Sequence, residues 1–350
     1  MPEPRSLQSF TLDELREALT GLGFKSFRAA QIFQWAYRHH ARSFGEMTSI
    51  AAADRERLAS LFTIASLPVL RMERSSDGTR KFLFGLADGH TIESVLIPDE
   101  DRQTLCISSQ VGCGQACRFC LTGSGGLVRD LEAGEIVLQV VETLRLLAAE
   151  GAPPITNIVL MGMGEPLANF DQVVRALALM TGEHGLGISP RRITLSTAGL
   201  VPGIDRLARS GIPVNLAVSL NASTDEVRDR IMPVNRRFPL AELLAACRRF
   251  PLGSRRRITF EYVLLKDVND SEEDARRVAR LLRGIRSKVN LIPFNPFPGC
   301  GFERPDDRAV RRFQQVLLGR NFTAPVRVSR GRDISAACGQ LREQRGTTPS

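Results

Sequence analysis

The chain has 350 residues, of which 43% are hydrophobic and 24% charged, as in an ordinary globular protein, and its formal net charge is +9. This surplus favours a polyanionic partner such as nucleic acid, although an Arg-rich proteome would give the same balance. No apolar run is long enough to cross a bilayer, and no basic segment followed by an apolar one opens the chain, so we expect a cytoplasmic protein without membrane contact. In that compartment thiols stay reduced, so we expect the seven cysteines to serve chemistry or metal ligation and not a disulfide framework.

Residues 1–65 are predicted to form a small helical module. Residues 11–23 have helical periodicity, with Thr11 as the N-cap and Glu14 three residues later. Residues 26–40 continue as a second helix with apolar side chains on one face and basic ones on the other. The basic face is that of an RNA-binding unit or of a solvated surface, and the pattern alone leaves both open.

A β-rich connector is expected at 66–105. Residues 79–86 and 90–98 read as strands on either side of a turn at Asp88 and Gly89, and 104–110 as the next strand. These strands lead directly into a cluster of cysteines.

From about residue 130, helices and strands alternate at a spacing that predicts parallel βαβ units, and hence an α/β barrel or a doubly wound sheet. We place the core at 106–330 and a C-terminal loop with a disordered polar tail at 331–350. The predicted helices are 131–150, 170–180, 201–210, 240–250, 271–285 and 309–319, and the strands are 155–162, 191–197, 214–221, 255–265, 288–294 and 325–329.

The stretch VGCGQACRFCLTG places Cys113, Cys117 and Cys120 within eight residues. Three thiolates at this spacing can bind three corners of a [4Fe–4S] cluster and leave the fourth iron open to a substrate or cofactor. The alternative is a structural zinc site with Cys106 as the fourth ligand, which is weaker because no second C-x-x-C pair is present.

This loop, with Phe119 just before the last cysteine, resembles that of the radical S-adenosylmethionine (SAM) superfamily. The resemblance implies that SAM binds the open iron, at the carboxyl ends of the strands of a partial barrel. Gly162, Gly164 and Glu165 in LMGMGEPL look like the superfamily's motif for the methionyl amine. Further cofactor contacts are expected from residues at strand ends, although each of the polar ones, taken alone, fits a turn or capping role better: Ser196, Ser219, Leu220, Asn221 and Asn295.

Several segments together resemble the RlmN/Cfr family of radical SAM RNA methyltransferases. They are TLCISSQVGCGQACRFCLTG, VLMGMGEPLANFDQVVRAL, VSLNASTDEVRDRIMPVNR, NLIPFNPFPG and SRGRDISAACGQL. The resemblance implies methylation of an adenine in 23S rRNA and in tRNA, a [4Fe–4S] cluster, two SAM molecules per turnover, an electron donor such as flavodoxin, and a monomer. One departure is Asn221, where the family segment S-L-H-A has histidine.

The resemblance also implies three catalytic roles. Cys338 would carry the methyl group as S-methylcysteine, Cys106 would resolve the covalent RNA adduct through a transient disulfide with Cys338, and Glu93 would accept the proton. From the residues alone, Cys338 and Cys106 would read as buried thiols and Glu93 as a surface carboxylate. Cys247 reads as core, and Cys300 has no assigned role.

Three functions therefore remain in view. The fuller N-terminal module favours the carbon-2 adenine methyltransferases of this family. Members that methylate carbon 8 of the same adenine use the same cysteines, so the motifs do not separate them. A non-catalytic RNA-binding protein with a structural metal is the least favoured, because it gives no task to Cys106 and Cys338.

Overall fold

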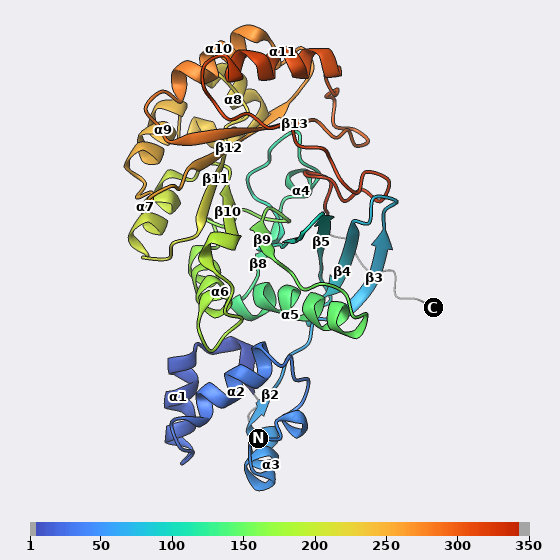
Figure 1. The fold of residues 1–350 in the computed structure, drawn as a ribbon, viewed down its shortest axis with the longest axis vertical. Coiled ribbons are helices and arrows are strands. Elements are labelled where there is room, and N and C mark those ends of the chain that lie inside the picture. The colour runs from blue at the N-terminus through green and yellow to red at the C-terminus, as the bar shows by residue number, and fades with distance from the viewer. Residues whose placement is uncertain (1–4, 343–350) are drawn as a thin grey trace.

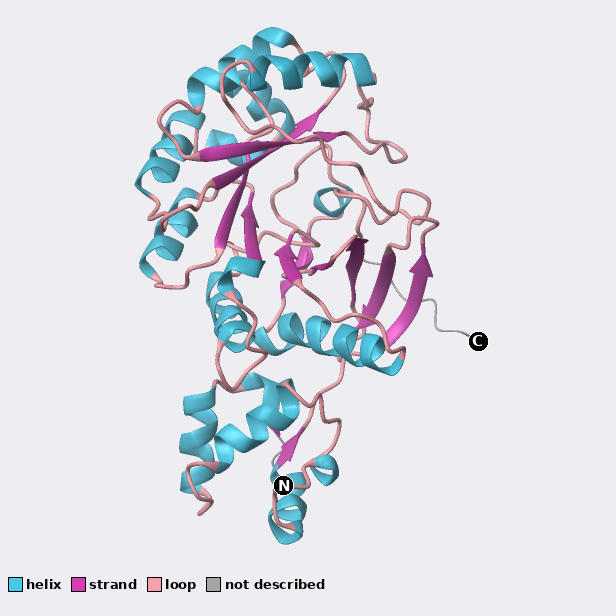
Figure 2. Cartoon of the chain, in the orientation of Figure 1, coloured by secondary structure: helices cyan, strands magenta, loops and turns pink. Residues whose placement is uncertain are grey.

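One nine-stranded sheet organises the chain, in the order β13-β12-β11-β10-β9-β6-β5-β4-β3. The computed structural model, which describes residues 5–342, shows this sheet curved into an open arc, with most helices on its convex side (Figure 1; Figure 2). The small helix α4 (Leu121–Ser124) and the loops around it lie on the concave side.

The predicted hairpin is confirmed and forms the antiparallel part of this sheet. β3 (Val69–Arg74), β4 (Arg80–Gly85) and β5 (Thr91–Asp99) pair antiparallel, and β5 pairs in the same way with β6 (Arg102–Cys106). The first of these strands was not predicted. β6 pairs in parallel with β9 (Asn157–Leu160), so the connector and the barrel share one continuous sheet.

The parallel part confirms the predicted α/β class and partial barrel. β9 is followed in the sheet by β10 (Ile193–Thr197), β11 (Asn215–Ser219), β12 (Ile258–Leu264) and β13 (Ser287–Pro293), all parallel. Every residue of β12 is buried, as expected for a parallel strand covered on both faces.

The strand predicted at 325–329 is wrong. This segment makes only an isolated bridge between Val326 and Leu291 of β13. Its apolar and polar residues alternate as in a strand, and its backbone bonds to β13 run only from Thr323, which accepts from Val289 N–H, to Arg327, which donates to Leu291, too few for a named strand.

The helices predicted within the barrel are all present, and one more, α8, follows β11. Their apolar faces pack on the sheet and supply much of the core. The helices are α5 (Ala133–Ala149), α6 (Phe170–Thr181), α7 (Val201–Arg209), α8 (Asp225–Ile231), α9 (Leu240–Arg249), α10 (Glu272–Leu281) and α11 (Asp307–Leu318).

The N-terminal module packs beneath α5 and α6 (Figure 1). It contains β1 (Arg5–Ser6), α1 (Leu12–Gly21), α2 (Arg28–Tyr37), α3 (Ala52–Leu61) and β2 (Phe62–Thr63), with the two short strands paired. The predicted capping box at the start of α1 is confirmed: the Thr11 and Glu14 side chains each bond to the other's backbone N–H.

Part of the expected basic face of this module is used inside the protein. Arg28 pairs with Asp54 at 2.9 Å, and Arg38 donates to the carbonyl of Glu183 in the barrel. Both guanidinium groups therefore hold the module together or attach it to the barrel.

Within residues 5–342, no helix is long and apolar enough to cross a membrane. The predicted disordered tail falls largely on residues 343–350, which lie outside the described residues.

Candidate active site

The cysteine loop lies between β7 (Gln110–Gly112) and α4, and neighbouring backbone holds it at both ends. The N–H of Cys113 donates to the carbonyl of Gly126 at 2.7 Å, next to β8 (Leu127–Asp130), and the N–H of Arg118 donates to Ile231 at the end of α8 at 3.0 Å. These bonds fix a loop too short to have a core of its own.

The donor set of this loop fits an iron–sulfur cluster. Burial raises the pKa of Cys113 to about 12 and that of Cys117 well above its usual value, so a thiolate here needs an adjacent cation. Across the described part of the chain, no three His, Cys, Asp or Glu side chains converge around a single-ion position. A cubane instead takes each thiolate at a separate corner, which three cysteines spread along a loop can provide.

The C-terminal loop closes over α4 and brings Cys338 to the cysteine loop. Leu121 N–H donates to the carbonyl of Gly339 at 2.7 Å, and the Thr122 hydroxyl donates to the carbonyl of Leu341 at 2.5 Å. In Figure 1 this segment passes α4 toward the ends of β4 and β3. Residues more than 200 positions apart in the chain therefore meet at this point.

The thiol of Cys338 lies among other thiols. The residue is exposed, but protein atoms surround its sulfur: the pKa of Cys338 is raised to about 12, mainly by burial and to a smaller extent by Cys120, Cys106 and Glu261. A Cβ at Gly339 would lie 3.8 Å from the Cα of Cys120, so the C-terminal loop brings Cys338 to a predicted cluster ligand. Cys106 is near enough to act on Cys338 electrostatically. All cysteines of the described residues are free thiols, so the disulfide between Cys106 and Cys338 stays a prediction.

Glu93 is buried and attached to the same C-terminal loop. Its side chain is 1% exposed, its Oε1 lies 3.3 Å from Lys81 Nζ, and its Oε2 accepts from the N–H of Arg342 at 3.0 Å. Burial raises the pKa of Glu93, while Lys81 and the Arg342 N–H oppose that rise. A buried carboxyl group with a raised pKa suits proton transfer.

Sheet register places Glu93 and Cys106 on one face. Cys106 at the end of β6 is paired with Val95 of β5, and Glu93 lies two residues before Val95. Because side chains alternate along a strand, Glu93, Val95 and Cys106 point to the same side. Burial raises the pKa of Cys106 to about 12.

The GMGEP loop after β9 packs against the strand that leads into the cysteine loop. A Cβ at Gly164, whose φ is +103°, would lie 2.7 Å from Gln110, and one at Gly162 would lie 2.8 Å from the Ile107 carbonyl. Both glycines are required by this approach of the chain to itself. Their contact with a cofactor stays a prediction.

The carboxylate of Glu165 is occupied within the protein. Its two oxygens accept from the N–H groups of Leu167 at 3.0 Å and Ala198 at 2.6 Å, and burial raises its pKa to about 7. It thereby ties the GMGEP loop to the end of β10. Its contact with the methionyl amine stays a prediction.

The other predicted cofactor residues follow parallel strands, so they gather at one edge of the sheet. Asn295, which follows β13, is 5% exposed, and its Oδ1 has no hydrogen-bond partner among the described residues. An unpaired buried amide oxygen fits a site that a polar cofactor completes. Ser196 is the fourth residue of β10, Ser219 ends β11, and Leu220 and Asn221 follow it.

Arg228 of α8 is a site residue that sequence reasoning missed. Its fully buried guanidinium donates to the carbonyls of Leu220, Ser219 and Ala198 and to the Asn235 side chain, at 2.7–3.0 Å. It therefore fixes the ends of β10 and β11, where the predicted cofactor residues lie. Nothing in the sequence marks this arginine among 47 basic residues.

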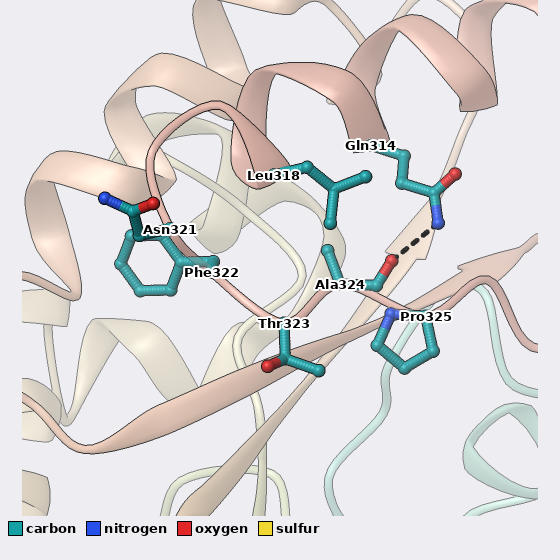
Figure 3. A pocket seen from close by; sticks show the side chains of 7 residues that line it. All are labelled: Gln314, Leu318, Asn321, Phe322, Thr323, Ala324 and Pro325. Carbon is teal, nitrogen blue, oxygen red and sulfur yellow. Dashed lines mark hydrogen bonds between the residues drawn. The ribbon is translucent and has the colours of Figure 1, made fainter.

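A pocket lies apart from this site, between α11 and the chain that follows it. Figure 3 shows its lining, in which the Gln314 amide donates to the Ala324 carbonyl at 2.8 Å. Leu318 and Phe322 supply apolar surface there. None of the predicted site residues lines this pocket.

Comparisons with known proteins cover nearly the whole chain. Residues 6–64 match the family described as the ribosomal RNA large subunit methyltransferase N-terminal domain, and residues 107–279 match the radical SAM superfamily. The chain is 57% identical over 336 residues to the dual-specificity RNA methyltransferase RlmN of Geobacter sulfurreducens, covering 96% of this chain and 91% of that protein. It is 54% identical to the protein of the same description from Geotalea uraniireducens, covering 97% of both chains.

A solved structure agrees with this similarity. The crystal structure of a radical SAM methyltransferase from Sphaerobacter thermophilus superimposes with a TM-score of 0.92 at 49% sequence identity. The match covers 97% of this chain and 99% of that one.

Proposed function

Because this chain belongs to the RlmN family of radical SAM RNA methyltransferases, we propose that it methylates carbon 2 of an adenine in 23S rRNA, at the peptidyl-transferase centre, and of the adenine 3′ to the anticodon in tRNA. The observation that supports this most directly is the meeting of Cys338, Cys106 and the cysteine loop beside Glu93. Cys338 comes from a distant part of the chain, and its approach to the cysteine loop supports the role that the family gives it.

Cys113, Cys117 and Cys120 would hold a [4Fe–4S] cluster, with SAM bounded by the strand-end residues Ser196, Ser219 and Asn295. When bound, the cluster and SAM supply one-electron cleavage of the sulfonium and a radical that abstracts hydrogen. The protein's part is to orient this cofactor toward Cys338. The Leu121–Gly339 hydrogen bond supports that arrangement, since it joins the residue after Cys120 to the residue after Cys338.

Cys338 would carry the methyl group to the RNA, because a sulfur atom accepts a methyl group readily and departs as a good leaving group. Glu93 would take the proton from carbon 2 of the adenine. Cys106 would then attack the sulfur of Cys338 and form a disulfide, while the methylene carbon that leaves the sulfur takes up a proton and becomes the methyl group of the released RNA. The shared face of Glu93 and Cys106 supports these assignments.

The partner and setting follow from the same family. RNA would be held through its phosphates by the basic chain, with one base turned into the site. We further propose an electron donor such as flavodoxin, a monomer, and a cytoplasmic location.

The test is anaerobic turnover with trideuteromethyl SAM and RNA that lacks the mark, followed by mass spectrometry of the nucleosides. We expect 2-methyladenosine that retains two of the three deuterium atoms, because one is abstracted from the cysteine-bound methyl group. Three retained deuterium atoms would mean direct transfer and reject the route through Cys338. Two retained deuterium atoms on 8-methyladenosine would support the route through Cys338 but show that carbon 8 is the methylated position.

A further inference from the structure

Three charged side chains form a continuous row from the candidate site to the edge of the sheet. Oε1 of Glu93 on β5 lies 3.3 Å from Nζ of Lys81 on β4, and Oε2 of Glu73 on β3 lies 2.9 Å from the same nitrogen. Both are ion pairs, and the buried Oε2 of Glu73 has no hydrogen bond among the described residues. Lys81 thus bridges two carboxylates, one of which is the candidate base.

Sheet register explains why the three side chains meet. Lys81 is directly opposite Glu73 in the β3–β4 pair and opposite Val95 in the β4–β5 pair, while Glu93 lies two residues from Val95. The first contact is a direct cross-strand pair and the second a diagonal one, and both lie on one face. The row is therefore a property of the sheet and needs no loop to hold it.

Exposure increases along the row. The side chain of Glu93 is 1% exposed, that of Lys81 is 6% and that of Glu73 is 33%. β3 is the edge strand, so Glu73 lies where the sheet meets solvent. The row leads from the buried carboxyl group of Glu93 to the edge of the sheet.

Other groups of the described residues also contact this row. Arg71 on β3 lies 3.9 Å from Glu73, the Arg342 N–H donates to Glu93, and the backbone N–H of Glu93 contacts the sulfur of Met163. Lys81 is the ammonium group in contact with the Glu93 carboxylate. An isolated carboxylate buried at this depth would be strongly disfavoured without such a partner.

We propose that Lys81 is a positioning residue for Glu93 and that Glu93, Lys81 and Glu73 form the path along which the adenine proton leaves the site. This inference rests on the proposed role of Glu93 as the base. It adds the residues that keep that base ready and reset it after each turnover.

Each proton transfer along this row has a donor and an acceptor. Glu93 as carboxylate takes the proton from carbon 2, and the electron pair of the broken C–H bond stays on the adenine. The protonated Glu93 gives its proton to Lys81 as the Lys81 ammonium gives one of its own to Glu73. Lys81 remains an ammonium group, Glu93 is again a carboxylate, and Glu73 releases the proton to water.

The experiment follows the covalent RNA–protein adduct through a single turnover, on denaturing gels, at a series of pH values. Lys81→Met and Glu73→Gln should each lengthen the lifetime of the adduct about tenfold near neutral pH, a small part of what general-base catalysis contributes. In Lys81→Met the pKa of Glu93 rises further, because the opposing ammonium is gone. The pH below which the decay of the adduct slows should therefore be higher in this variant. Lys81→Arg, which keeps the charge, should restore most of the rate.

Matched controls lie on the same strand. Arg80 neighbours Lys81 on β4 but points to the other face, where it pairs with Glu150 at 2.5 Å. Arg80→Met and Glu150→Gln remove equivalent charges without touching Glu93, and we expect adduct lifetimes like that of the unchanged protein. Thermal unfolding of each variant shows that the fold is retained, and Glu73→Gln at the sheet edge should be well tolerated.

Release of RNA at the unchanged rate from either Lys81→Met or Glu73→Gln would overturn the proposed path. If Glu93→Gln also releases RNA at that rate, the fault lies in the assignment of the base. If even Cys106→Ala forms no adduct, the proposed function itself fails.

Discussion

At the scale of single residues, Asn221 shows how a departure from a family pattern is absorbed. Its φ is +54°, a left-handed conformation that asparagine adopts more readily than most residues. Its Oδ1 accepts from the N–H of Val263 at 2.8 Å, and its Nδ2 contacts the sulfur of Met232. The side chain therefore links the end of β11 to β12, and both of its polar groups have partners in the protein.

The two catalytic cysteines should give different failures when each is removed. Cys338→Ala should abolish turnover, because no methyl carrier remains. Cys106→Ala should permit attachment of the RNA but not its release, so adduct should accumulate. Denaturing gels measure the adduct, and nucleoside mass spectrometry measures the methylated product. Cys300→Ala, a partly buried loop thiol outside the site, is the control. Free methylated RNA at a normal rate from either site variant would contradict the scheme.

Arg228 should matter more for stability than its place on a short helix suggests. Arg228→Met would leave the carbonyls of Leu220, Ser219 and Ala198 without their buried donor, and we expect a loss of about 3 kcal/mol. Urea unfolding measures this free energy. Arg230→Met, an exposed arginine on the same helix, should change it by less than about 0.5 kcal/mol. Equal effects of the two changes would show that the buried hydrogen bonds contribute little.

At the scale of elements, the site is built by short segments that pack on one another. The GMGEP loop lies against residues 107–110, where Met163 accepts from Ser109 N–H and Gln110 accepts from Glu165 N–H. The cysteine loop follows directly, and the C-terminal loop closes over α4. Movement of any one of these segments would displace the others, so the geometry of the site depends on all of them.

Gly164→Ala tests this packing. Its added Cβ would clash with Gln110 and Ser109 at 2.7 Å, in addition to the strain of a positive φ, and we expect a loss of roughly 3 kcal/mol together with weaker SAM binding. Gly89→Ala is the matched control, because φ of Gly89 is +84° but no atom lies within 4 Å of an added Cβ. We expect it to lower the free energy of unfolding by about 1 kcal/mol. Urea unfolding and calorimetric SAM titration separate the two effects. Similar losses in both variants would mean that backbone strain alone explains them.

At the scale of the whole molecule, side chains of the barrel hold the N-terminal module. Arg175 on α6 makes two hydrogen bonds to the carboxylate of Glu14 on α1, and Arg145 on α5 donates to the carbonyls of His40 and Ala41. These contacts place the module beneath α5 and α6, on the side of the barrel away from α4 (Figure 1). RNA that contacts both the module and the site would therefore span the molecule.

The attachment of the module should depend on pH. The hydrogen bonds from Arg175 lower the pKa of Glu14 to about 2, against an ordinary 4.5. A depressed carboxyl pKa contributes stability above pH 4.5 and loses it as the pH falls toward 2. Because the Glu14 side chain is 45% exposed, Arg175→Met should cost only about 0.5 kcal/mol at pH 6, and the difference should vanish near pH 2. Urea unfolding at several pH values measures it.

Arg16→Met is the control for this dependence. Arg16 pairs with Asp13 on the same helix and does not contact the barrel. A difference for Arg175→Met that stays constant between pH 6 and 2 would show that the ion pair with Glu14 is not its source.

Much of the fold could be predicted, since alternating helix and strand periods demand parallel βαβ units and the capping box marks the start of α1. What failed has a physical reason. The segment 325–329 has the pattern of a strand but forms only an isolated bridge. β3 is mostly exposed, so its sequence lacks the alternation of apolar and polar residues by which a half-buried strand is recognised. The basic residues of the N-terminal module look solvated in sequence, yet Arg28 and Arg38 are occupied by partners within the protein.

By itself the sequence determined the class of chemistry, because thiol spacing is local: Cys113, Cys117 and Cys120 lie within eight residues and need no folded context to be recognised. Only the tertiary structure decided which side chains surround that loop. Cys338 reaches it through bonds between residues 121–122 and 339–341, and Lys81 reaches Glu93 through strand register. Neither contact has a local signal, because each depends on how distant segments pair and pack.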